Sequence, residues 1–193
     1  TSQSTLDATK LSGNLPALNG SALTNIDGGK ILQVVQLSKT DTASVTMPAA
    51  PSISPDAISQ SITPSSSSSK VLVRATLCVG TNESSRKIYA HLYRGGSVVS
   101  GAIGDAAGSR QRVSAVTFID NINITGISNR IAMLSHEYLD SPSSTSSLTY
   151  SYRFSHDATN GARTLWINRE ETNNDDSHSA RAYSSITLME VAA

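Results

Sequence analysis

The chain has 193 residues, of which 38% are hydrophobic, and this is enough to bury one core of ordinary size. Its 15 basic and 15 acidic residues give a formal net charge of zero, which provides no basic surface for nucleic acid or anionic lipid. No apolar run approaches the roughly 20 residues that a membrane-spanning helix needs, so neither nucleic acid binding nor membrane insertion is expected.

The stretch over residues 11–30 is the first with a recognisable pattern. Its apolar side chains recur every three to five residues and are Leu11, Leu15, Leu18, Leu23 and Ile26. Gly13, Pro16 and Gly20 exclude a stable isolated helix, so these side chains need partners outside the stretch. The simplest partners are two further copies of the same stretch, which predicts a shaft and oligomerisation segment over residues 1–30 of a homotrimer.

A turn signal at residues 27–29 precedes a change to β-strand patterns, so residues 31–193 are predicted to form a separate head domain. Apolar runs and period-2 alternation predict strands over residues 31–37, 44–47, 58–62, 70–79, 87–94, 97–103, 112–122, 131–139, 148–155, 162–168 and 183–191. Gly95-Gly96 predicts a two-residue hairpin between two of these strands. Without a convincing amphipathic helix, the strands predict an all-β head that is a sandwich or a barrel, and an antiparallel, jelly-roll-like β-sandwich is the first choice.

Two of the strands indicate which faces are buried. Over residues 70–79 one face is wholly apolar. The other face combines Arg74 with Leu72 and Cys78, so we expect it to be only partly exposed to solvent. Cys78 is the single cysteine, and we expect a small buried side chain rather than a reactive thiol. The strand over residues 183–191 is apolar on both faces, which predicts a central place in its sheet.

No spacing in the sequence matches a known catalytic or metal-binding motif. His136-Glu137 begins like a zinc-protease motif, but position 140 is Asp140 and the segment alternates like a strand. Gly108-Ser109 lacks the second glycine of a nucleophile elbow. We therefore expect no enzymatic activity, no cofactor and no metal.

A polar loop over residues 170–179 combines the greatest chemical variety with expected exposure. Its carboxylates could form a hydrolytic pair or hold a hard cation, but a solvated loop accounts for them more simply. The preceding tryptophan could offer its face to a sugar, although a core position is the simpler interpretation. For a receptor-binding site we nominate Trp166, Asn173, Asp175, Asp176 and His178.

Tyr89, His91 and Tyr93 form a stripe on a strand whose other face is aliphatic. One interpretation is lateral packing within a single subunit. The other is a trimer interface around a symmetry axis, where tyrosine supplies contact area while its hydroxyl finds a partner. We nominate these three residues, together with the apolar residues of the shaft, as interface candidates.

Six stretches support a resemblance to a known family. In chain order they read LSGNLPALNGSALTNIDGGKILQVVQ, SITPSSSSSKVLV, IGDAAGSR, EYLDSPSSTSSLTY, LWINR and SSITLMEV. In this order and spacing they resemble tail-fibre proteins of tailed bacteriophages, especially those of phages that infect aquatic bacteria. The resemblance implies a homotrimeric virion component with a slender shaft and a β-structured tip that meets the host.

Two functions follow as expectations. The first is a fibre tip that binds a host cell-surface glycan or protein receptor for adsorption, with other virion proteins contacting its N-terminal side. The second is a structural virion protein, such as a capsid decoration or head fibre, that does not recognise a host. Either would be located on the virion, and a fibre tip would act outside the cell. A depolymerase is disfavoured, because such enzymes commonly use a long solenoid and no carboxylate pair is convincing.

Overall fold

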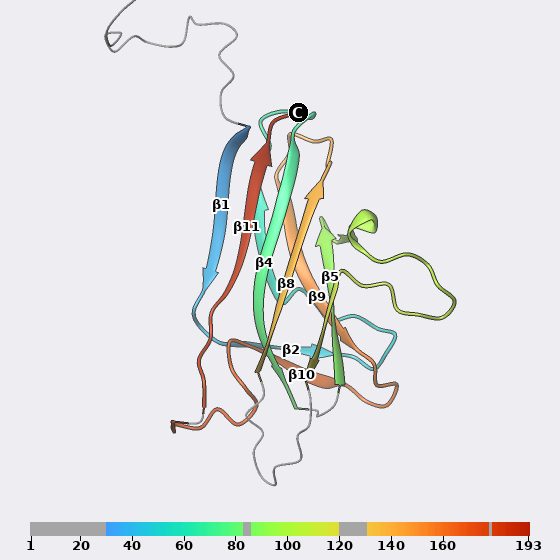
Figure 1. The fold of residues 1–193 in the computed structure, drawn as a ribbon, viewed down its shortest axis with the longest axis vertical. Coiled ribbons are helices and arrows are strands. Elements are labelled where there is room, and N and C mark those ends of the chain that lie inside the picture. The colour runs from blue at the N-terminus through green and yellow to red at the C-terminus, as the bar shows by residue number, and fades with distance from the viewer. Residues whose placement is uncertain (1–29, 83–85, 120–130, 178) are drawn as a thin grey trace, which may run out of the picture.

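The computed structural model describes residues 30–82, 86–119, 131–177 and 179–193, which form two antiparallel β-sheets (Figure 1). Sheet A contains β1 (Ile31–Lys39), β2 (Ala43–Met47), β4 (Lys70–Thr81), β8 (Ile131–Asp140), β10 (Arg163–Ile167) and β11 (Ser184–Val191). Sheet B contains β3 (Ile58–Ile62), β5 (Arg86–Arg94), β6 (Ser97–Val98), β7 (Ala115–Ile119) and β9 (Leu148–His156). A turn of 3₁₀ helix, η3 (Ser100–Ala102), follows β6. The prediction of an all-β sandwich is confirmed.

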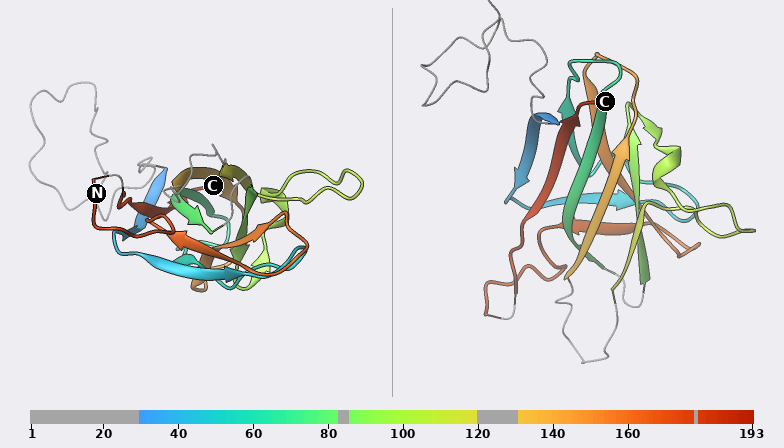
Figure 2. Two further views of the ribbon diagram at one scale, coloured as in Figure 1. Left: turned by 90° about the horizontal axis from the view of Figure 1, so that it is seen from below. Right: turned by 45° about the horizontal axis from the view of Figure 1, so that its top comes forward.

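The strand order is that of a jelly roll. Sheet A runs β1-β11-β4-β8 and sheet B runs β3-β9-β5-β7. Numbered in chain order without β2, β6 and β10, these strands follow the orders 1-8-3-6 and 2-7-4-5, which define the eight-stranded double Greek key. The additional strands β2 and β10 pair with each other and run across the sandwich toward the end away from Ile31 (Figure 2).

The alternation of β4 and β11 explains their central positions. In β4, Val71, Val73 and Leu77 point inward and are fully buried, while Arg74 is exposed on the other face. β11 pairs with β1 on one side and with β4 on the other, which confirms the central place predicted for it. β4 pairs with β11 over residues 70–76 and with β10 over residues 79–81.

Aromatic side chains of β9 fill the space between the sheets. Tyr150, Tyr152 and Phe154 are fully buried, and each such side chain contributes about 1.5–3 kcal/mol when it leaves water. The Tyr150 hydroxyl donates to Asp140 at 2.7 Å, and the Tyr152 hydroxyl lies 2.8 Å from Nδ1 of His136. The core therefore accommodates two tyrosines because each hydroxyl has a polar partner.

Two predicted strands were too long. The strand expected over residues 97–103 ends at Val98, because the chain turns into η3 where Gly101 packs against the Tyr138 hydroxyl. The strand expected over residues 112–122 begins only at Ala115, and residues 120–122 lie outside the described part of the chain. Ser114 still contacts β5, since its amide donates to the carbonyl of Ala90 at 2.9 Å and its hydroxyl accepts from the amide of Leu92 at 3.0 Å.

Other predicted boundaries agree more closely with the structure. The hairpin at Gly95-Gly96 is confirmed, and both glycines have positive φ angles of 56° and 83°. The first described strand begins at Ile31, immediately after the predicted boundary. The shaft candidates Leu11, Leu15, Leu18, Leu23 and Ile26 lie outside the described residues.

Candidate functional site

The loop that joins β10 to β11, residues 169–182 and here called the distal loop, contains most of the nominated receptor-binding residues. It lies at the end of the sandwich away from Ile31 (Figure 1). Asn173, Asp175 and Asp176 are exposed on it, as predicted from its polar composition. His178 lies outside the described residues.

Trp166 lies beside this loop rather than in it. It is on the outward face of β10, where it is half-buried, while its neighbours Leu165 and Ile167 point into the core. The guanidinium carbon of Arg169 lies 5.0 Å from the centre of the indole ring, within the range of a cation–π interaction. Trp166 is thus neither a core side chain nor an open platform, because Arg169 occupies one face of its ring.

The carboxylate of Glu170 links the two ends of the distal loop through a hydrogen bond to Ala180. Only 2% of this residue is exposed, and its Oε1 accepts a hydrogen bond of 2.7 Å from the amide of Ala180. Arg169 donates to the carbonyls of Glu170 and Glu171 at 3.0 and 3.1 Å. No group of three or more histidine, cysteine, aspartate or glutamate side chains among the described residues is arranged to hold a metal ion.

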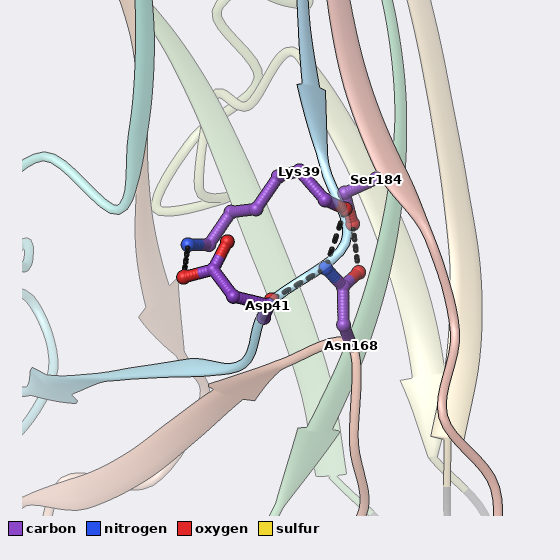
Figure 3. Close-up of polar contacts among 4 residues, drawn as sticks. All are labelled: Lys39, Asp41, Asn168 and Ser184. Atoms are coloured by element: carbon purple, nitrogen blue, oxygen red, sulfur yellow. Dashed lines mark hydrogen bonds and ion pairs between the residues drawn. The ribbon is translucent and has the colours of Figure 1, made fainter.

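Asn168 anchors the base of the distal loop (Figure 3). Its Nδ2 donates to the carbonyls of Lys39 and Asp41 at 2.8 and 2.9 Å, at the corner between β1 and β2. Its Oδ1 accepts from the Ser184 hydroxyl at 2.6 Å, and that hydroxyl accepts from the amide of Cys78 at 2.9 Å. One fully buried amide therefore connects β1, β4, β10 and β11 where the loop begins.

The backbone of Asn168 takes part in the same junction. Its amide donates to the Cys78 carbonyl at 2.9 Å, and its carbonyl accepts from the amide of Ala182 at 3.0 Å. Its φ angle is +63°, in the left-handed region that asparagine tolerates better than most residues. No local pattern in the sequence indicates this role, because every partner is distant along the chain or is main chain.

The members of the Tyr89–Tyr93 stripe differ in what covers them. His91 is 3% exposed, its Nε2 lies 2.8 Å from the Ser155 hydroxyl, and burial lowers its pKa to about 4, so it is neutral at pH 7. The guanidinium carbon of Arg153 lies 4.2 Å from the ring centre of Tyr93. Tyr89 is half-buried, and burial raises its pKa. Lateral packing within one subunit therefore accounts for His91 and Tyr93, and the trimer interface at this stripe stays a prediction.

A polar pocket of about 370 Å³ lies at the end of the sandwich where β1 begins. Arg94 and Asp140 form an ion pair in its wall, and Asp140 also accepts from the buried Tyr150 hydroxyl, whose pKa burial raises. Ser97 and Ser100 add hydroxyls to the lining. Because the carboxylate is already paired with a guanidinium, this pocket offers polar contacts rather than an acid–base pair.

Sequence reasoning missed an apolar row on the outward face of sheet A. Four side chains lie next to one another in register across four strands, in the order Val34, Met189, Leu72 and Leu139. Val34 is 55% exposed and Leu139 is 43% exposed. Part of the signal was present in the sequence, since Leu32 and Val34 share one face of the first strand, and Met189 and Val191 share one face of the last.

A second apolar patch, here called the sheet B patch, comprises Tyr89, Val113, Val116 and Phe118 on the outward face of sheet B. Val116 and Phe118 are 54% and 51% exposed. Lys87 and Arg110 border the patch, and no aspartate or glutamate is among the residues that line it.

Among the described residues, no helix has the length and apolar composition that crossing a membrane requires.

The comparisons with known proteins place this chain in no family. No family model matches the sequence, and no curated protein matches it. The solved structures that match include that of the infectious bursal disease virus Gt strain and that of the VP2 subviral particle of the same virus. Each has a TM-score of 0.39, with 12% and 11% identity respectively, over 83% of this chain and 38% of the viral chain. This chain thus spans well under half the length of either.

Proposed function

We propose that this chain is a structural protein of a virus particle whose jelly-roll head associates with other copies of itself. The observation that carries the proposal is a pair of exposed apolar surfaces on the outward faces of both sheets. The jelly roll is a fold that viral capsid domains use, although a fold alone does not determine a function. The resemblance of six sequence stretches to tail-fibre proteins supports the same location.

The energetic argument concerns side chains that would otherwise face water. Full burial of a valine, leucine or phenylalanine side chain stabilises by about 1.5–3 kcal/mol, so covering one that is half-exposed contributes about 1 kcal/mol. Contiguous apolar surface of this kind marks contact sites, whereas single exposed apolar residues are ordinary. No catalytic role is part of the proposal.

The test of assembly is the molecular mass in solution. Size-exclusion chromatography with light scattering on the full chain at micromolar concentration is expected to give a trimer of the 20.3 kDa subunit. A stable monomer would contradict the proposal. Immunogold labelling of virus particles then locates the protein, and the structural function requires gold on the capsid or on a fibre.

Receptor binding is the second candidate, and one specific observation favours it. Asn173, Asp175 and Asp176 are exposed on a loop whose base is held rigidly by Asn168, at the end away from Ile31. A rigid polar loop at the free end of a fibre is suited to contact a surface glycan or protein.

Cell binding distinguishes the two candidates. If the chain binds a receptor, the fluorescently labelled full chain binds host cells, and simultaneous alanine substitution of Asn173, Asp175 and Asp176 reduces binding at least tenfold. Asp105→Ala, an exposed carboxylate in a different loop, is the control and should bind like the wild type. Absence of wild-type binding at saturating concentration, with gold on the capsid, favours the purely structural function.

A further inference from the structure

We propose that the outward face of sheet A is the surface on which a second copy of this chain packs, with the apolar row at the centre of the contact. The inference rests on the self-association proposed above and identifies the face that carries it. That face looks toward the viewer in Figure 1, where β1, β11, β4 and β8 lie side by side.

The apolar row is continuous and purely aliphatic. Val34 pairs with Met189, Met189 with Leu72, and Leu72 with Leu139, so that one apolar side chain from each strand meets the next. Directly opposed residues on neighbouring strands have Cβ atoms about 5 Å apart, so the row leaves no polar gap. Leu32 extends the row at its β1 end and is 49% exposed.

The polar groups in the outward row on one side of the apolar row are already paired within the subunit. The next outward row contains Arg74 and Glu137, whose Nε and Oε2 atoms are 2.6 Å apart, and both side chains are more than half exposed. In the same row Gln36 donates to the Thr187 hydroxyl at 2.7 Å. Burial of this row against another surface would leave no charge without a partner. On the other side of the apolar row Lys70, which stands opposite Val191, is exposed at the start of β4, so its ammonium group lies at the rim of the face.

This internal pairing favours an identical copy as the partner. Copies related by symmetry bring the same groups toward a common axis, so a face with unbalanced charge repels itself. The centre of the sheet A face carries a balanced pair and Lys70 lies at its rim, whereas Lys87 and Arg110 line the sheet B patch itself. We therefore assign the contact between copies to the surface on sheet A.

The size of the outward face of sheet A also suits an interface between two copies. Four strands at a spacing of about 4.8 Å, with about 3.3 Å for each of the nine residues of β1, give a face of about 19 by 30 Å. Its projected area of about 570 Å², increased by side-chain relief, approaches the roughly 800 Å² that one partner contributes to a standard interface. A shallow groove of about 690 Å³ beside Val34 and Met189 would receive protruding side chains or an edge of the neighbour.

Thiol labelling tests this inference with a matched pair. Val34 and Val116 are the same residue type, are 55% and 54% exposed in a single subunit, and lie on opposite sheets. Each is replaced by cysteine in a Cys78→Ala background, and the rate of maleimide labelling is measured on the assembled full chain. Circular dichroism and thermal melting establish that both variants fold.

The expected result is at least tenfold slower labelling of V34C than of V116C. Equal rates in an intact oligomer would overturn the inference while leaving the proposed self-association standing. Protection of V116C instead would overturn it and place the contact at the Tyr89–Tyr93 stripe, because Val116 pairs with Tyr89. A monomeric wild type would contradict both the inference and the proposed function.

Discussion

Replacement of Asn168 is predicted to destabilise the head strongly, because its side chain satisfies polar groups of β1, of the corner before β2 and of β11. Asn168→Ala removes three side-chain hydrogen bonds, each with a net contribution of about 1 kcal/mol. It also places alanine at a φ angle of +63°, which costs about 1 kcal/mol. The expected loss in free energy of unfolding is about 4 kcal/mol, a large fraction of the 5–15 kcal/mol typical of a domain.

Two further substitutions at Asn168 separate the cost of the lost hydrogen bonds from the cost of the left-handed backbone. Asn168→Gly tolerates the left-handed backbone but loses the hydrogen bonds, so its cost is expected to be about 3 kcal/mol plus a smaller entropic penalty. Asn168→Asp keeps the size of the side chain but directs a carboxylate oxygen at two carbonyl groups, and it is expected to be the most damaging of the three.

The control is Asn173, which also has a positive φ angle, of 44°, but is exposed. Asn173→Gly is expected to change stability by less than about 0.5 kcal/mol. Urea unfolding at fixed protein concentration, followed by the fluorescence of the single tryptophan, measures all four variants. If Asn168→Gly and Asn168→Asp unfold within 1 kcal/mol of the wild type, the junction does not hold the strands as argued.

Three further predictions concern residues elsewhere in the fold. Burial would raise the pKa of Glu190, but hydrogen bonds from Ser65 and Gln33 outweigh burial and lower the pKa to about 2. The ionised carboxylate therefore stabilises the folded chain fully above about pH 4.5, and this contribution is lost as the pH falls toward 2. Urea unfolding should therefore show Glu190→Gln to be less stable than wild type by about 2 kcal/mol at pH 7, and a gap that does not narrow between pH 4.5 and 2 would contradict this. A Cβ at Gly101 would overlap the hydroxyl of Tyr138, so Gly101→Ala should cost about 1–3 kcal/mol in thermal unfolding, whereas Gly104→Ala, with open space around it, should be neutral. Asp140→Ala leaves a partly buried guanidinium and a buried tyrosine hydroxyl without their acceptor, so it should lower the free energy of unfolding in urea by more than about 1 kcal/mol. A smaller loss would show that this ion pair does not stabilise the fold.

Strict alternation made several strands predictable. In β9 the inward residues Tyr150, Tyr152 and Phe154 alternate with polar ones, and this period predicted a strand over residues 148–155. The period did not show that Ser151 and Ser155 on the other face are buried as well. A jelly roll was the first choice among the possible sandwiches, but alternation does not distinguish it from other strand orders, and the order follows only from the strand pairing. The end of β6 was not predictable, because the contact between Gly101 and Tyr138 joins residues far apart in the chain.

The candidate site was predictable only in its composition. A run of short polar residues predicts an exposed loop, and Asn173, Asp175 and Asp176 are exposed. Which face of Trp166 is covered depends on the course of the chain beyond β10, which brings Arg169 over the ring. The anchoring by Asn168 depends on carbonyl groups at the corner between β1 and β2, and no periodicity encodes such a contact.

The apolar row and the distal loop lie at opposite ends of the same sheet, and this separation has a functional consequence. Leu32 and Val34 are near the start of β1, whereas Asn168 anchors the loop at the end of β10, where β1 also ends. If copies pack through the row, the jelly roll between them fixes the spacing and direction of the distal loops. Several weak contacts made by loops held in a fixed array can raise avidity by about 10² or more over a single contact. Variants of the row should therefore weaken cell binding through loss of avidity, while variants of the distal loop should weaken it without changing the mass of the assembly.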